Sequence, residues 1–251
     1  MSNIKQNLTI NIKEDKMKNG FTMAEVLVTL GIIGIVASMT MPGLIKKHKR
    51  VESETRLKKA YSTISQAFLT AQAKHGEAKD WPEWETSAEE ILKRYIAPEI
   101  KGAKVFASSE SKSNLMCYEG KFVGNYMNGN KESTQYGWMD KVYISSPFYP
   151  NNTASIKLMD GTCIGLNYNS EKSPKALFID INGSYRRPNV AGYDLFFFQV
   201  VENTIRPYGY DWKTEDLFNA SKGNSCHPKA NRGGRVCAAK IMGDNWTIKY
   251  W

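Results

Sequence analysis

The sequence predicts an α+β protein in which one long N-terminal helix packs on an antiparallel β-sheet. Three patterns along the chain lead to this prediction. The first is a run of twenty-five mostly apolar residues, Phe21 to Ile45, that contains a single charged residue, Glu25. The second is an apolar residue at every third or fourth position from Leu57 to Ala71, and the third is alternation of apolar and polar residues between 155 and 201. Spacing of three and four is typical of a helix, and alternation is typical of a half-buried strand.

The apolar run is long enough to cross a membrane. As a helix with a rise of about 1.5 Å per residue it spans roughly 37 Å, and the hydrocarbon core of a bilayer is about 30 Å thick. A secretory signal peptide also has an apolar run, but its core is shorter and it ends at small residues, and Ala37-Ser38-Met39 is a poor cleavage site of that kind. We therefore expect a transmembrane segment at residues 21–45, continuing as one helix to about Lys74, where His75-Gly76 provides a stop.

Pro42 lies inside the predicted helix. Proline removes one backbone donor and its ring clashes with the preceding turn, so a kink or local melting is expected between Met39 and Gly43. The alternative is a separate soluble helix that begins after a break at Pro42-Gly43.

Glu25 is the unusual residue of the apolar run. A carboxylate inside a membrane helix costs a few kcal/mol and is kept where it has a partner. If the chain is cut between Gly20 and Phe21, the new ammonium lies one helical turn from Glu25, and the ammonium of a neighbouring subunit would serve equally well. The alternative is a carboxylate at the headgroup level, solvated and inert.

The residues around this position carry a family resemblance. Gly20 followed by Phe21-Thr22-Met23-Ala24-Glu25-Val26, a Leu/Ile/Val/Gly run and Pro42 resembles the prepilin cleavage and methylation motif of type IV pilins and type II secretion pseudopilins. The resemblance implies a pilin-like fold and a structural subunit. It also implies that a membrane-embedded prepilin peptidase cleaves after Gly20 and N-methylates Phe21, and that Glu25 is the assembly residue.

This resemblance sets the expected organisation of the chain. Residues 1–20 are a prepilin leader, with Met17 as a second possible start, residues 21–45 are the transmembrane and assembly half of the helix, and residues 46–251 are an extracytoplasmic pilin-like domain. The expected partners are other pilin or pseudopilin subunits, the prepilin peptidase, an inner-membrane assembly platform and membrane lipid. The flank after the helix, Lys46 to Arg50, is as basic as the leader, so orientation in the bacterial cytoplasmic membrane rests on the resemblance and on the cysteines.

Four cysteines lie in the second half of the chain, and none is arranged as Cys-x-x-Cys. An even number without metal-binding spacing favours two disulfides in an oxidising compartment. Of the three possible pairings, the short Gly-rich loop favours Cys226 with Cys237, which leaves Cys117 with Cys163. Reduced, buried cysteines are the alternative.

Strands are expected in the second half of the chain. Ser155 to Met159 and Thr162 to Tyr168 form a predicted hairpin with an Asp160-Gly161 turn, and Ala176 to Ile181 and Leu195 to Val201 are two more strands with a turn at Asn182-Gly183. Before them, a short helix is expected from Ser87 to Ile96, ended by Pro98.

The stretch from Phe178 to Phe196 carries a second, looser resemblance to the C-terminal half of pilin-like proteins of the type II secretion group. Calcium-binding members suggest that Asp180, Asn182 and Asp194 offer oxygens to calcium. The spacing does not fit an EF-hand loop, and a simple turn is the alternative. No other cofactor is expected.

The sequence has no motif that indicates an enzyme. It has no phosphate-binding Gly-rich loop with Lys, no Gly-x-Ser-x-Gly and no His-Glu-x-x-His, and its three histidines have no evident nucleophile or ligand set. Ser109 and Lys112 match Ser-x-x-Lys by chance, in a polar loop at Ser108 to Asn114. An extracytoplasmic enzyme on a tether is the least favoured hypothesis.

The formal charge of +9 favours anionic surfaces such as lipid headgroups or nucleic acid. The alternative function is therefore a minor pilin that binds DNA or a surface. Trp246, Tyr250 and Trp251 could stack on single-stranded nucleic acid, but a closing strand that packs its aromatic side chains in the core is favoured, and nucleic acid is not the expected partner.

Overall fold

The computed structural model describes residues 20–85, 87–107, 117, 127, 153–167, 175–183, 186 and 188–250. The chain divides into two compact units, one up to Lys47 and one from His48 onward. The leader before Gly20, the loop at 108–114 with Ser109 and Lys112, Tyr168 and Trp251 lie outside the described residues.

Helix α1 runs without interruption from Met23 to His75. The predicted single long helix is confirmed, and the expected melting at Pro42 and the alternative of two separate helices are wrong. The reason is that a proline removes only its own N–H from the ladder, so the hydrogen bonds on either side still hold the helical backbone. The expected kink stays a prediction.

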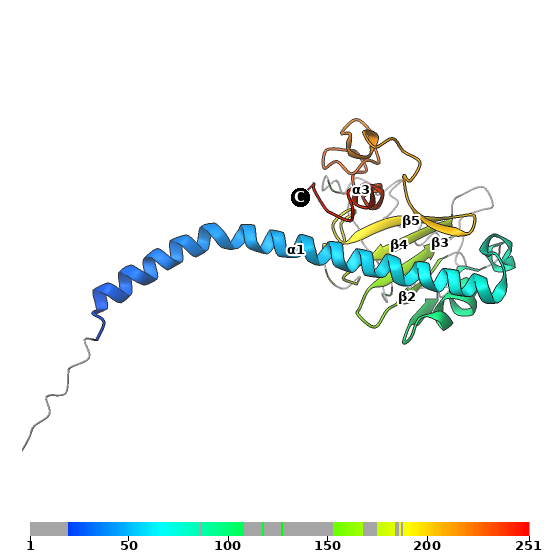
Figure 1. Cartoon of the computed structure of the whole chain (residues 1–251), viewed down its shortest axis with the longest axis horizontal. Helices are drawn as coiled ribbons and strands as arrows, with labels where there is room; N and C mark the ends of the chain where they lie inside the picture. The colour runs from blue at the N-terminus through cyan, green and yellow to red at the C-terminus, as the bar shows by residue number, and fades with distance from the viewer. Residues whose placement is uncertain are drawn as a thin grey trace, which may run out of the picture. The chain divides into compact units, whose positions relative to one another are not determined.

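The larger unit contains one antiparallel sheet of six strands in the order β1-β2-β3-β4-β5-β6 (Figure 1). The bounds of the strands are β1 Lys104–Ala107, β2 Thr153–Lys157, β3 Cys163–Asn167, β4 Lys175–Asp180, β5 Leu195–Val201 and β6 Thr204–Pro207. The α+β fold class is confirmed, since every strand pairs antiparallel with the next and α1 packs on the sheet. Strands β1 and β6 were not predicted.

The sheet is buried on both faces. Leu177 and Ile179 of β4 and Phe196 and Phe198 of β5 belong to the core that includes the second half of α1. Phe178 and Phe197, the residues between them, belong to a second cluster on the opposite face. The alternation of side chains along a strand explains this division, because successive residues point to opposite faces. The second half of α1 supplies its side of the core at helical spacing, with Leu57, Ala60, Ile64, Ala67, Phe68 and Ala71.

The predicted hairpin and short helix form with different ends. Strands β2 and β3 pair as expected, but Leu158 N–H donates to Thr162 O at 2.9 Å, so the connection is longer than the two-residue Asp160-Gly161 turn. The short helical segment consists of α2 Ala88–Ile91, capped by the Ser87 side chain, then Leu92–Ile96 and a last turn Ala97–Glu99. Pro98 does not end it, because proline is tolerated in the first turn of a helical segment, where no N–H is needed. Three further short helical turns lie at Ala78–Asp80, Pro82–Glu85 and Asp216–Phe218.

The described residues at the C-terminus form no strand, although a closing strand that includes Trp246 and Tyr250 was expected. Helix α3 spans Cys237–Gly243, residues 244–246 form a turn, and residues 247–250 have no regular secondary structure. The expectation of a strand is therefore wrong, but Trp246 and Tyr250 do pack on the core, with the Trp246 ring 5.4 Å from that of Tyr61 on α1. The disulfides are Cys117–Cys163 and Cys226–Cys237, the pairing that the sequence favoured.

Candidate functional site

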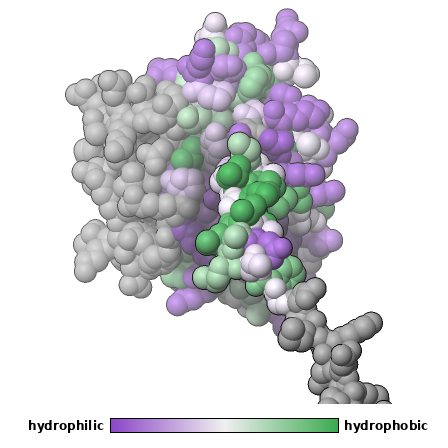
Figure 2. All heavy atoms as spheres, turned by 90° about the vertical axis from the view of Figure 1, so that its left-hand side faces the viewer, coloured by the Kyte–Doolittle hydropathy of each residue, from purple (hydrophilic) through white to green (hydrophobic). Residues whose placement is uncertain are grey.

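The first half of α1 is apolar and exposed. Its large hydrophobic side chains, from Met23 to Ile45, are between 39% and 80% exposed. Figure 2, which looks onto the N-terminal end of α1, shows green hydrophobic side chains at its surface. This part of α1 is long and apolar enough to cross a membrane. The predicted transmembrane segment therefore lies on the half of α1 whose large apolar side chains are exposed.

A capping box caps the N-terminus of α1. Thr22, the residue before the helix, donates its backbone N–H to Glu25 Oε2 at 2.8 Å and its hydroxyl to the same oxygen at 3.0 Å. In return, Glu25 N–H donates to Thr22 Oγ1 at 3.2 Å. A Thr-x-x-Glu arrangement of this kind satisfies two of the donors that every helix leaves unpaired at its N-terminus. Glu25 is thus held on the positive end of its own helix.

The predicted cleavage site lies directly before this cap. Gly20 and Phe21 precede the helix, and Phe21 is 88% exposed. The carboxylate uses Oε2 for Thr22, and Oε1 has no hydrogen-bond partner among the described residues. One oxygen of Glu25 is therefore free to receive an ammonium. Thr22 was identified as part of the motif, but its capping role was not predicted, although Thr followed three residues later by Glu before an apolar run is the signal of a capping box.

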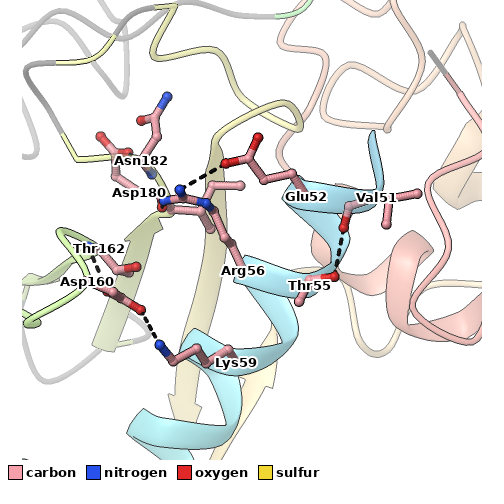
Figure 3. A network of polar contacts seen from close by, with 10 residues as sticks. Val51, Glu52, Thr55, Arg56, Lys59, Asp160, Thr162, Asp180 and Asn182 are labelled. Atoms are coloured by element: carbon pink, nitrogen blue, oxygen red, sulfur yellow. Dashed lines mark hydrogen bonds and ion pairs between the residues drawn. The ribbon is translucent and has the colours of Figure 1, made fainter. Parts of the chain in front are cut away.

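The second half of α1 binds two turns of the sheet through polar side chains (Figure 3). Lys59 Nζ lies 2.8 Å from Asp160 Oδ2 in the β2–β3 turn. Arg56 donates to Ile181 O at 3.3 Å, just after β4, and pairs with Glu52 at 2.9 Å on its own helix. These cross-links fix the helix at the same end of the sheet where both turns lie.

The two turns also contact each other. Gly183 has a φ of +81°, and a Cβ at this position would lie 2.7 Å from the carbonyl oxygen of Gly161. Only glycine fits such a left-handed position this close to a backbone atom. Partial burial acts to raise the pKa of Asp160, but hydrogen bonds from Lys59 and Thr162 hold that pKa below its ordinary value.

The three residues predicted to bind calcium lie together at the β4–β5 turn. Asp180 Oδ1 accepts the N–H groups of Asn182 and Gly183, and Asn182 Nδ2 donates to Asp194 Oδ2 at 3.1 Å. Asp194 also accepts the N–H groups of Asn189 and Val190. Both carboxylates are buried, and burial with the nearby Asp194 charge raises the pKa of Asp180 to about 7. Burial also raises the pKa of Asp194, although its N–H donors oppose the effect.

These bonds support a turn in preference to a metal site. Both oxygens of Asp194 are occupied by N–H donors, which leaves Asp180 Oδ2 and Asn182 Oδ1 as buried oxygens without a partner among the described residues. Calcium takes six to eight oxygen ligands. The described part of the chain contains no group of three or more His, Cys, Asp or Glu that could hold a metal ion. Calcium binding stays a prediction.

Comparison with known proteins finds two matching family models in the chain. A model of the prokaryotic N-terminal methylation motif matches residues 15–41, and a model described as a family of unknown function (DUF6613) matches residues 43–250. The chain belongs to the DUF6613 family. Searches of curated proteins and of solved structures gave no match.

The two family models match different parts of this DUF6613 chain. The methylation motif covers Gly20, Phe21, Thr22 and Glu25, and so it supports the identification of the chain as type IV pilin-like. The DUF6613 region begins at Gly43 and includes the second half of α1 and all six strands. One chain therefore combines a pilin-like fold, the methylation motif, a helix able to span a membrane and two disulfides.

Proposed function

We propose that this DUF6613 protein is a structural subunit of a type IV pilus-like or type II secretion filament, of the pseudopilin kind. In this proposal a prepilin peptidase cuts the chain after Gly20 and methylates Phe21. The subunit then polymerises through α1. The observation that carries the proposal is an exposed, apolar half-helix that begins at Met23, just after the predicted cleavage position, and has Glu25 in the capping box of its first turn. A methylation motif of this kind belongs to structural proteins, which speaks against an enzyme.

The capping box supplies a physical reason for assembly. An acidic side chain costs about 3 kcal/mol at the centre of a membrane helix on insertion scales, and Glu25, in the first turn of α1, carries a smaller cost of the same kind. Thr22 satisfies one carboxylate oxygen, and the other remains for the ammonium that cleavage creates at Phe21 of the same or a neighbouring chain. Pairing across subunits removes an uncompensated charge from the hydrocarbon and sets the register between adjacent helices.

The proposed cellular location of the protein follows from its apolar segment and its disulfides. Residues 21–45 lie in the bacterial cytoplasmic membrane, and residues 46–251 form the extracytoplasmic domain. Two disulfides support this orientation, since disulfides persist in oxidising compartments. The partners are other pilin-like subunits, the prepilin peptidase, an inner-membrane assembly platform and membrane lipid.

Co-expression of the full chain with a prepilin peptidase tests the proposal. Gly20→Ala should sharply reduce cutting, because the peptidase recognises the residue before the bond. Glu25→Ala should leave cutting largely intact and impair polymerisation, measured as sedimentable filaments against the same amount of processed subunit. Normal filaments from the Glu25→Ala chain would contradict the pairing of Glu25 with the ammonium.

A further inference from the structure

The globular unit, which begins at His48, carries opposite charges at the two ends of its part of α1. Residues 48–59, at the start of this part, include five Lys or Arg and two Glu. Residues 77–99, which follow the end of the helix, include seven Asp or Glu and three Lys or Arg. From His48 to His75 the helix is about 40 Å long at about 1.5 Å per residue. The charge of the unit therefore changes sign along the helix.

The turn after β4 adds to the basic end. Arg56 on α1 donates to Ile181 O at 3.3 Å, and Arg186 N–H donates to Gly183 O at 2.9 Å in the turn that follows Ile181. We call residues 48–59 and the turn 181–186 the basic end. Three of its cations are exposed, and their side chains form no hydrogen bond or ion pair among the described residues: Lys49, Lys58 and Arg186.

The segment after the helix lies against the last turns of α1 (Figure 1). Lys74 Nζ lies 2.7 Å from Glu99 Oε1, and Gln72 Nε2 donates to Asn203 O in the β5–β6 turn at 3.1 Å. We call residues 77–99 and Glu202 the acidic end. Three of its acids are exposed, and their side chains form no hydrogen bond or ion pair within the part of the chain that the structure describes: Asp80, Glu90 and Glu202.

Ion pairs within each end do not remove the difference in charge. At the basic end, Arg56 pairs with Glu52 and Lys59 with Asp160. The described ion pairs at the acidic end are Glu77–Lys79, Glu83–Arg94, Glu89–Lys93 and Glu99–Lys74. These pairs neutralise equal numbers of acids and bases. Each end therefore keeps exposed charges of one sign that can contact another molecule.

We propose that the basic end of one globular unit docks on the acidic end of a second copy of this chain. The inference deepens the proposed function and rests on it, because it adds a contact between globular units to the filament. A contact between two different surfaces of one molecule is heterologous, and repeated heterologous contacts that do not close produce open filaments. Contact between two like ends would place charges of the same sign together, which repulsion opposes. The charges thus favour a head-to-tail arrangement.

The test uses the full chain co-expressed with a prepilin peptidase and measures sedimentable filaments against the same amount of processed subunit. One variant reverses the basic end by Lys58→Glu with Arg186→Glu, and another reverses the acidic end by Asp80→Lys with Glu90→Lys. Each variant should lower the yield of filaments about tenfold, because exposed pairs change from attraction to repulsion. The yield of the wild type should fall as salt screens the charges.

Restoring opposite charges should restore the filaments. In an equal mixture of the two variants, one chain has two acidic ends and the other has two basic ends, so unlike ends can pair again. The mixture should sediment like the wild type. A chain that carries all four reversals should do the same, because its ends have only exchanged their signs.

The matched controls reverse the same number of charges in the segment from Tyr208 to Val236, which supplies no residue to either end. They are Lys213→Glu with Lys229→Glu, and Asp211→Lys with Glu215→Lys, all at exposed positions. Both controls should keep the wild-type yield. Thermal unfolding verifies that every chain folds.

Wild-type yields from both end variants, an equal loss in the controls, or no recovery in the mixture would overturn the inference. A loss at the basic end with none at the acidic end would make an anionic surface the occupant and would overturn it as well. The mass of each preparation separates these results from the proposed function. A chain cut before Phe21 that sediments whatever these charges are contradicts this inference alone, whereas a cut wild-type chain that never sediments contradicts the proposed filament too.

Discussion

The two halves of α1 have the same backbone and opposite surroundings. In the second half, Leu57 is fully buried and Ile64 is 1% exposed, whereas in the first half Leu30 is 60% and Ile33 is 62% exposed. The second half buries its apolar residues on one side, which the sheet covers, and leaves Val51 and Leu69 exposed. The first half is apolar all round, and no single protein face could cover it.

The difference shows where each half finds its partner. The core of the second half is complete within the chain, and polar contacts of Arg56, Lys59 and Tyr61 fix it to loops and strands of the sheet. The first half begins with a capping box that includes Glu25, and its large apolar side chains are exposed. Changes in the second half should therefore alter folding, and changes in the first half should alter membrane insertion and assembly.

The largest expected effect is a pH dependence that belongs to the globular unit alone. The pKa of Asp180 is about 7 in the folded chain and 3.8 ordinarily, so the folded state binds more protons than the unfolded state between these values. The free energy of unfolding should fall as pH rises from about 4 to about 7, by about 4 kcal/mol from this group, and level off above. Denaturant titrations at several pH values measure it.

Asp180→Asn provides the control for this dependence. The amide keeps one oxygen for the N–H groups of Asn182 and Gly183 and carries no charge. The variant should lose most of the slope and should be more stable than the wild type at pH 8. A slope that remains after the substitution would assign the effect to other groups, Asp194 first among them.

Truncation of one leucine in each half compares the two surroundings directly. Leu57→Ala should lower the free energy of unfolding of the globular unit by about 3 kcal/mol, because it removes buried methyl groups and leaves a cavity. Leu44→Ala, at a side chain that is 69% exposed, should leave that free energy unchanged. Equal losses in denaturant titrations would show that the first half also folds against its own chain.

The smallest expected effect is at the capping box. Thr22→Val removes the hydroxyl that exchanges hydrogen bonds with Glu25 and should destabilise the first turn of α1 by about 1 kcal/mol. Faster amide exchange of the first turn in detergent micelles would report it. Thr29→Val is the matched control, because Thr29 donates to Val26 O within the helix and caps nothing; similar exchange in both variants would exclude a capping role.

The sequence predicted the features that depend on long or local patterns. The single helix, the β2–β3 hairpin and the two disulfides follow from periodicity, from turn residues and from a short loop between Cys226 and Cys237. Strands β1 and β6 have four residues each, too few to show a period. Trp246 and Tyr250 suggested a strand, but they lie in a turn and an irregular segment after α3, because tertiary packing overrides such preferences.

The candidate site was predicted only in part, because only local patterns can be read from a single sequence. Gly20, Phe21 and Glu25 belong to a contiguous motif and were identified, and Thr22 belongs to it as well but its side chain acts only through Glu25. The burial of Asp180 and the contact of Arg56 with Ile181 depend on residues more than a hundred positions apart. Such long-range pairs leave no signal in a single sequence.

The N-terminal residue of the mature chain is the most direct test of the whole account. The full chain, recovered from membranes of cells that contain a prepilin peptidase, is digested, and its first peptide is identified by mass spectrometry. The account predicts N-methylated Phe21 as the first residue, which places the ammonium one helical turn before Glu25. A mature chain that begins at any other residue, or that keeps Gly20, would contradict it.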